Sequence, residues 1–115
     1  MKMLKNCIKL SNSIKIYVPS TINVDKEYYS SVYVERTLAF LSSKFGGSTS
    51  TNALGAWVTE NGSLVKEKVT IVLSYCDPVG LEEHIESIYE FCLQIKKDLS
   101  QEAIALEINN ELYLI

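Results

Sequence analysis

The residue types that most often carry catalytic or metal chemistry are scarce in this 115-residue sequence, which has one histidine and three cysteines. Cys7, Cys76 and Cys92 include no pair with CxxC spacing, so the sequence predicts neither a disulfide framework nor a zinc site. We expect three reduced thiols. With His84 as the only histidine, a Cys–His nucleophile is not favoured. No metal ion and no cofactor is predicted.

Long apolar runs are also missing. No run approaches the roughly 18 apolar residues of a membrane-spanning helix, so no membrane span is expected. Residues 1–12 contain Lys2, Lys5 and Lys9 but no sustained apolar stretch and no small-residue cleavage site, which does not fit a signal peptide. We interpret them as a flexible leader or an added strand. Residues 13–115 are expected to form a single α+β domain in the cytoplasm.

Arginine is as scarce as histidine, and this bears on the uneven distribution of charge. The net charge is −3 at pH 7. Residues 1–76 hold eight lysines and one arginine against five acids, whereas residues 77–115 hold two lysines against nine acids. Such asymmetry is found in nucleic-acid-binding proteins. Arg36 is the only arginine, however, and arginine is preferred for bidentate phosphate contacts, which weakens that interpretation.

The strongest local pattern is a β-hairpin between Leu54 and Tyr75. Two β-prone runs flank the segment Glu60-Asn61-Gly62-Ser63, and an Asn-Gly step is typical of a tight reversal between antiparallel strands. The second run alternates, which predicts a strand with two distinct faces. The face assigned to the core comprises Val65, Glu67, Val69, Ile71, Leu73 and Tyr75. Glu67 is its one charged residue.

The other segments predict helices and strands around this hairpin. Residues 13–18 alternate as a half-buried strand, and residues 29–45 and 78–99 carry apolar stripes with helical spacing. Residues 101–115 predict a strand, a turn at Asn109-Asn110 and a short terminal strand. The order β-α-β-β-α-β with a short extra C-terminal strand predicts an α+β, two-layer ferredoxin-like sandwich. A different strand order within the same two-layer class is the alternative.

Polar side chains are expected to gather at one edge of this sheet. In the predicted topology Glu67 opens one strand and Glu102 another, and both face the helices. Gln101, Ser20 and Thr21 are expected near the same edge. Neighbouring strands lie about 4.8 Å apart, so these side chains can close around a ligand or a water. The hypothesis is a site for a small polar ligand; the alternative is that both carboxylates face solvent at strand ends.

The opposite, helix-free face of the predicted sheet combines aromatic and basic residues: Lys15, Tyr17, Trp57, Lys66, Lys68, Thr70 and Val72. Sheet-type RNA readers use such aromatic residues to stack bases. Small α+β domains also bury them against a copy of themselves. With one arginine and a negative net charge, we favour a homodimer interface over a solvated face or a nucleic-acid surface. The predicted interface residues are Tyr17, Trp57, Lys66, Lys68 and Val72.

Two segments, FGGSTSTNALGAWVTENGSLVKEKVTIV and QEAIALEIN, resemble a family of small uncharacterised bacterial proteins found in chromosomes and mobile elements. The resemblance covers roughly residues 14–115. The matching positions are Gly46, Gly47, Thr49, Gly55, Trp57, Gly62, Glu67, Gln101 and Glu102. It implies the two-layer fold and no particular activity.

Together these patterns favour a non-enzymatic, homo-oligomeric cytoplasmic protein that binds a small molecule or a protein partner. The first alternative is a small enzyme with Glu67 or Glu102 as general acid or base. The second alternative is a nucleic-acid binder that uses the helix-free sheet face.

Overall fold

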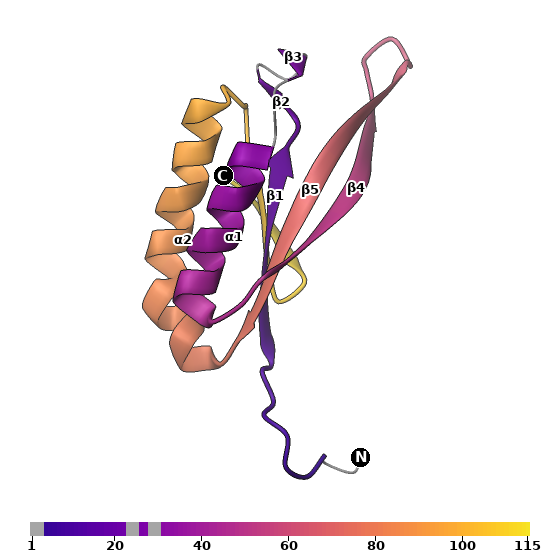
Figure 1. Cartoon of the computed structure of the whole chain (residues 1–115). Helices are drawn as coiled ribbons and strands as arrows, with labels where there is room; N and C mark the ends of the chain where they lie inside the picture. Colours follow the sequence, from indigo (N-terminus) through magenta and orange to yellow (C-terminus); the bar gives the residue numbers. More distant parts are fainter. Residues whose placement is uncertain (1–3, 23–25, 28–30) are drawn as a thin grey trace.

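The chain folds into two layers, a five-stranded antiparallel sheet with two helices on one of its faces (Figure 1). The computed structural model describes residues 4–22, 26–27 and 31–115. The predicted α+β, two-layer class is confirmed. The elements are β1 (Asn12–Pro19), β2 (Thr21–Ile22), β3 (Lys26–Glu27), α1 (Ser31–Phe45), β4 (Thr49–Val58), β5 (Leu64–Cys76), α2 (Pro78–Asp98), β6 (Ala105–Ile108) and β7 (Glu111–Leu114).

The main sheet has the strand order β4-β5-β1-β6-β7, and each neighbouring pair is antiparallel. β4 and β5 form the predicted hairpin. Its turn is closed by a 2.8 Å hydrogen bond from the Thr59 amide to the Ser63 carbonyl, and Gly62 has a φ of 87°, which glycine adopts without steric cost. Figure 1 shows this hairpin arching away from the helices, so its tip lies outside the packed body. The short strands β2 and β3 pair separately.

Capping residues fix where the helices begin and end. Asp77 precedes α2 and accepts a 2.7 Å hydrogen bond from the Gly80 amide, and Pro78 occupies the first helical position. α1 ends at Phe45, and Gly46 follows with a φ of 88°, the left-handed conformation that closes many helices. The predicted start of α1 at residue 29 lies outside the described residues.

The residues of β5 that are buried between the sheet and the helices are not the ones that we predicted for the core. Val72 is completely buried and lies opposite Ile16 of β1, while the buried Ser74 lies opposite Ile14. The even-numbered residues of β5 therefore face the helices. Glu67 lies on the helix-free face, so its predicted place on the core face is wrong, as is the placement of Val72 on the open face.

Two features of β5 explain why the alternation of apolar and polar residues predicted the wrong core face for this strand. The helix-facing position 74 holds a polar residue, whose hydroxyl donates a 2.6 Å hydrogen bond to the Gly47 carbonyl and so tolerates burial. The helix-free face, in turn, carries Val69 and Ile71, which are half-buried. Both faces of the strand are thus covered in part, and counting apolar residues does not distinguish them.

Residues 4–11 form an exposed N-terminal arm that runs away from the body (Figure 1). At its base, the Ser13 amide donates a 3.0 Å hydrogen bond to the Asn109 side chain. The arm contributes no strand to either sheet within the part of the chain that is described. No helix in the described ranges is both long enough and apolar enough to cross a membrane.

Candidate functional site

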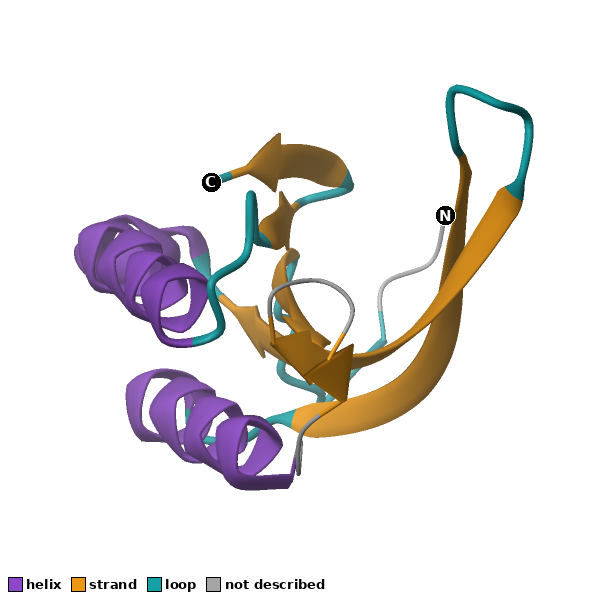
Figure 2. Ribbon diagram, turned by 90° about the horizontal axis from the view of Figure 1, so that it is seen from above, coloured by secondary structure: helices purple, strands orange, loops and turns teal. Residues whose placement is uncertain are grey.

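A hollow of about 790 Å³ lies on the helix-free face of the sheet. Figure 2, seen from above, shows the β4–β5 hairpin curving away on one side of this face and the C-terminal strand β7 on the other. The hollow is lined by Tyr17, Pro19, Gly55, Ala56, Trp57, Glu67, Val69, Gln101, Ala103, Ile104, Ala105, Leu112 and Leu114. All five strands of the main sheet and the loop before β6 therefore contribute to one site.

The register of the strands brings these side chains to one face. Gly55 lies opposite Glu67 and Trp57 opposite Val65 across the β4–β5 ladder, so all four residues face the helix-free side. On the other side of the hollow, β7 places Leu112 opposite Glu107 of β6. The hollow is thus a direct consequence of strand pairing together with the curvature of the hairpin.

The hollow is largely apolar, with few polar groups. Among its described lining residues, Glu67 supplies the one carboxylate, and Gln101 supplies an amide. The Tyr17 hydroxyl donates a 3.0 Å hydrogen bond to Glu107, whose other carboxylate oxygen lies 3.3 Å from the Lys15 ammonium. Burial, reinforced by this hydrogen bond, raises the pKa of Tyr17 above its ordinary value. The hydrogen bond to Glu107 holds the Tyr17 ring as one wall of the hollow.

The predicted ligand site is assembled only in part. Glu67 and Gln101 line the same hollow. Glu102 is exposed and is not among the lining residues, and Ser20 lines a different hollow with Lys68. The structure describes the backbone of Thr21 in β2 but not its side chain. The two carboxylates that we expected to share a site therefore do not line one hollow in the described chain.

The predicted interface residues separate onto two faces. Tyr17 and Trp57 line the hollow on the helix-free face. Lys66 and Lys68 alternate with Glu67 and so lie on the opposite face of β5, as the buried Val72 does. Lys66 and Lys68 therefore do not join the two aromatic rings in one surface, which weakens the pattern expected for a nucleic-acid surface. Association of two copies through the aromatic residues remains a prediction.

Sequence reasoning missed the contribution of β7 to the site. Asn109 and Asn110 have φ values of 51° and 68°, as a tight reversal with two left-handed residues requires, and the predicted terminal strand follows. Leu112 and Leu114 alternate with polar Glu111 and with Tyr113, which signalled a two-faced strand. The pattern gave no information on what those leucines would face.

No protein-family model matches the sequence, and no curated protein sequence matches it. Among solved structures, the chain is similar to a phage SAM lyase in complex with S-methyl-5'-thioadenosine, with a TM-score of 0.69 and 19% identity over 98% of this chain and 95% of that chain. It is also similar to a phage SAM lyase in the apo state, with a TM-score of 0.69 and 18% identity over 99% of this chain and 95% of that chain. At such identities the likeness shows a shared fold.

This likeness contradicts the hypothesis of a non-enzymatic binding protein, since both similar structures are enzymes. The first alternative was a small enzyme with Glu67 or Glu102 as general acid or base. The two carboxylates named in that alternative are not placed alike, because Glu67 lines the hollow and Glu102 does not.

Proposed function

We propose that this chain is a lyase that acts on S-adenosylmethionine and releases S-methyl-5'-thioadenosine, with the hollow around Glu67 as its active site. The observation that carries the proposal is an end-to-end likeness to a phage SAM lyase bound to that thioadenosine. The hollow supports it because it offers an aromatic wall, apolar side chains and one carboxylate.

The size and lining of the hollow suit an adenosine thioether. Its volume of about 790 Å³ falls within the range of small-molecule sites, about 300–1,000 Å³. Trp57 and Tyr17 offer aromatic faces on which an adenine can stack. Leu112 and Leu114 offer apolar surface for a methylthio group. Under this proposal the polar amide of Gln101 orients the nucleoside.

Glu67 suits a substrate whose sulfur is positively charged. A carboxylate attracts the sulfonium, and the attraction is stronger in a mostly apolar hollow than in water. Cleavage breaks the bond between sulfur and the four-carbon amino-acid chain, and sulfur keeps the electron pair, which leaves a neutral thioether. The four-carbon fragment becomes either a lactone, if its own carboxylate attacks the carbon that sulfur leaves, or an unsaturated amino acid, if a base removes a neighbouring proton.

The two routes give Glu67 different roles. In the lactone route the substrate's carboxylate and sulfonium neutralise one another, and exclusion of water from the hollow favours this loss of charge. Glu67 then only holds the sulfonium in place. In the elimination route Glu67 is the side chain that accepts the proton.

The test incubates the purified full-length chain with S-adenosylmethionine and follows both products by mass spectrometry. We expect S-methyl-5'-thioadenosine to form far faster than in buffer, and the four-carbon product identifies the route. S-Adenosylhomocysteine, a neutral thioether, is the matched control and is expected to stay intact. Binding has its own readout, because Trp57 is the only tryptophan and its fluorescence reports an adenine stacked on it. No thioadenosine above the buffer rate, with unchanged fluorescence, would overturn the proposal.

We also propose that the β-α-β-β-α-β core follows the ferredoxin-like arrangement. The order β4-β5-β1-β6 of its four strands, with β1 and β5 at the centre, supports this assignment. β7 is then an addition beside β6.

A further inference from the structure

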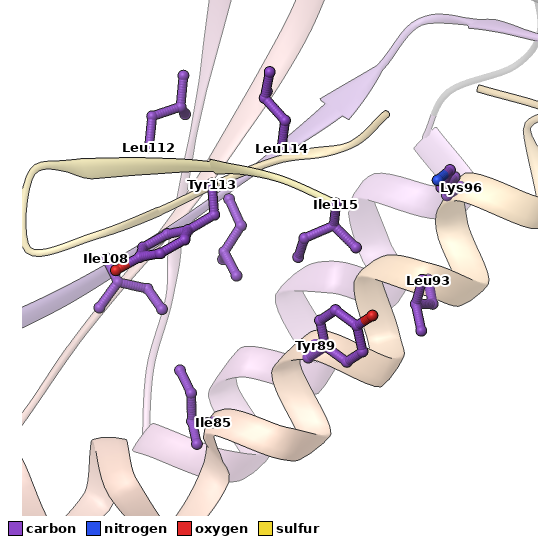
Figure 3. A pocket seen from close by; sticks show the side chains of 10 residues that line it. Ile85, Tyr89, Leu93, Lys96, Ile108, Leu112, Tyr113, Leu114 and Ile115 are labelled. Atoms are coloured by element: carbon purple, nitrogen blue, oxygen red, sulfur yellow. The ribbon is translucent and has the colours of Figure 1, made fainter. Parts of the chain in front are cut away.

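A second, apolar groove lies between α2 and the C-terminal hairpin, and it shares only Leu112 and Leu114 with the proposed active site. It has a volume of about 760 Å³. Figure 3 shows Ile85, Tyr89 and Leu93 along one side of α2, facing the strands that carry Ile108 and Tyr113. Tyr89 is 49% exposed and Tyr113 is 48% exposed, so the groove leaves large aromatic surface in contact with water. Exposed apolar patches of this kind are typical of interaction sites.

The groove borders a strand that lacks a neighbour. β7 is the last strand in the sheet order, so one of its edges pairs with no strand in the described chain. An extended peptide laid along such an edge gains backbone hydrogen bonds, and its alternate side chains enter the adjoining groove.

The N-terminal arm has the properties of such a peptide. Leu4 is 81% exposed and Ile8 is 91% exposed, although both are large apolar residues. The arm leaves the body next to the β6–β7 turn, where the Asn109 side chain hydrogen-bonds to Asn12, and it then runs away from both α2 and the β6–β7 hairpin (Figure 1). The arm and the groove are thus two apolar surfaces that do not meet within one chain.

Length and charge match between the arm and the groove. Extended, residues 4–11 span about 23 Å, whereas the groove side of α2 from Ile85 to Lys96 is about 17 Å long. The arm carries Lys5 and Lys9. Helical spacing puts exposed acids on the flank of α2 beside the groove: Glu82, Glu86 and Glu90.

We propose that the N-terminal arm of one copy of this chain lies in the groove between α2 and β7 of a second copy. Ile8 and Leu4 enter the apolar groove, the arm backbone pairs with the free edge of β7, and the two lysines face the acidic flank of α2. Reciprocal exchange of arms closes a dimer, and head-to-tail exchange closes a ring. The proposal does not depend on the lyase activity.

The first test measures the mass of the full-length chain by sedimentation velocity between 1 and 100 µM. We expect self-association that Ile8→Asp weakens at least tenfold. Leu54→Asp is the matched control, because Leu54 is also exposed (63%) but lies on the β4–β5 hairpin, outside the groove. A wild-type chain that is monomeric at 100 µM, or an oligomer indifferent to Ile8→Asp, would overturn the proposal.

Charge reversal tests the predicted pairing. The double variant Lys5→Glu with Lys9→Glu is expected to associate at least fivefold more weakly than wild type at low salt, since its arm then repels the acidic flank. Adding Glu86→Lys with Glu90→Lys to the same chain should restore association. Failure of this rescue, in variants that keep the wild-type circular dichroism, counts against the arm as the occupant.

Crosslinking decides whether the arm belongs to the same chain or to another. A photo-reactive benzophenone amino acid replaces Leu93, and unlabelled and ¹⁵N-labelled proteins are mixed before illumination. Crosslinks that join the groove of one isotope to residues 4–11 of the other support the proposal. Crosslinks only within one isotope, as from an arm that folds back, or no crosslink to the arm, overturn it.

Discussion

Gly55 of β4 lies directly opposite Glu67 of β5, and a Cβ atom added to Gly55 would lie 3.7 Å from the Glu67 carbonyl oxygen. Side chains at directly opposed positions are about 4.5–5.5 Å apart at their Cβ atoms. The glycine therefore leaves the space beside the Glu67 side chain open. Trp57, two residues further along β4, faces the same space. The pairing of Gly55 with Glu67 thus makes room for a ligand next to the carboxylate.

Filling that space is expected to block the site without unfolding the chain. For Gly55→Val we expect the affinity for S-methyl-5'-thioadenosine, measured by Trp57 fluorescence, to fall at least tenfold. A Cβ meets only ordinary van der Waals contact there, so the free energy of unfolding should change by less than about 1 kcal/mol. Gly55→Ala is the graded control and should bind within about threefold of wild type. Equal binding by all three proteins would mean that the ligand lies elsewhere.

Glu67→Gln tests the carboxylate itself. The amide keeps the size of the side chain and removes the charge that attracts the sulfonium, so we expect thioadenosine formation to fall at least 100-fold. Binding of the neutral product should change much less. Glu102→Gln is the control, because Glu102 is exposed and does not line the hollow, and it should retain activity within about twofold. A larger loss in the Glu102 variant would revive the paired-carboxylate hypothesis.

Val72→Ala tests the corrected face of β5. The side chain is completely buried against the helices, so its truncation should lower the free energy of unfolding by about 2 kcal/mol in urea titrations. Leu54→Ala removes a larger side chain from an exposed position of the neighbouring strand and should cost less than about 0.5 kcal/mol. If the two variants were equally stable, the assignment of faces would be wrong.

A buried thiol makes the free energy of unfolding depend on pH in the alkaline range. Burial raises the pKa of Cys92 from its ordinary value of 9.0 to about 12. The unfolded chain therefore loses this proton first, and the stabilisation that is complete below pH 9 decreases as the pH rises from 9 towards 12. This one thiol lowers the free energy of unfolding by at most about 1.4 kcal/mol per pH unit.

The measurement compares urea titrations of wild type and Cys92→Ala at pH 8, 9, 10 and 10.5. The variant is less stable at pH 8 because it leaves a cavity, but its stability should fall less steeply above pH 9. Other groups titrate in the same range, and the comparison cancels their contribution. Parallel slopes would show that the thiol ionises alike in folded and unfolded chains.

Local features of the fold were predictable because each depends on neighbouring residues. The Asn-Gly turn of the hairpin and the apolar stripe of α2 are encoded within a few residues of where they act. The two-layer class followed from the order of these elements. Glu67 and Gln101 were predicted as ligand-site residues because they interrupt or border an otherwise apolar strand pattern. Both line the hollow, although Glu67 was assigned to the wrong face, and their role in binding stays a prediction.

Which face of β5 meets the helices was decided only by tertiary structure. Alternation establishes that Val72 and Glu67 lie on opposite faces, but it does not say which face is covered. The choice is made by the register with β1, which sets Val72 opposite Ile16, and by the polar partner that allows Ser74 to be buried. The sequence by itself determined the elements and their two faces. Packing of the helices on one face, and curvature of the hairpin over the other, decided that Glu67 faces a hollow instead of the core.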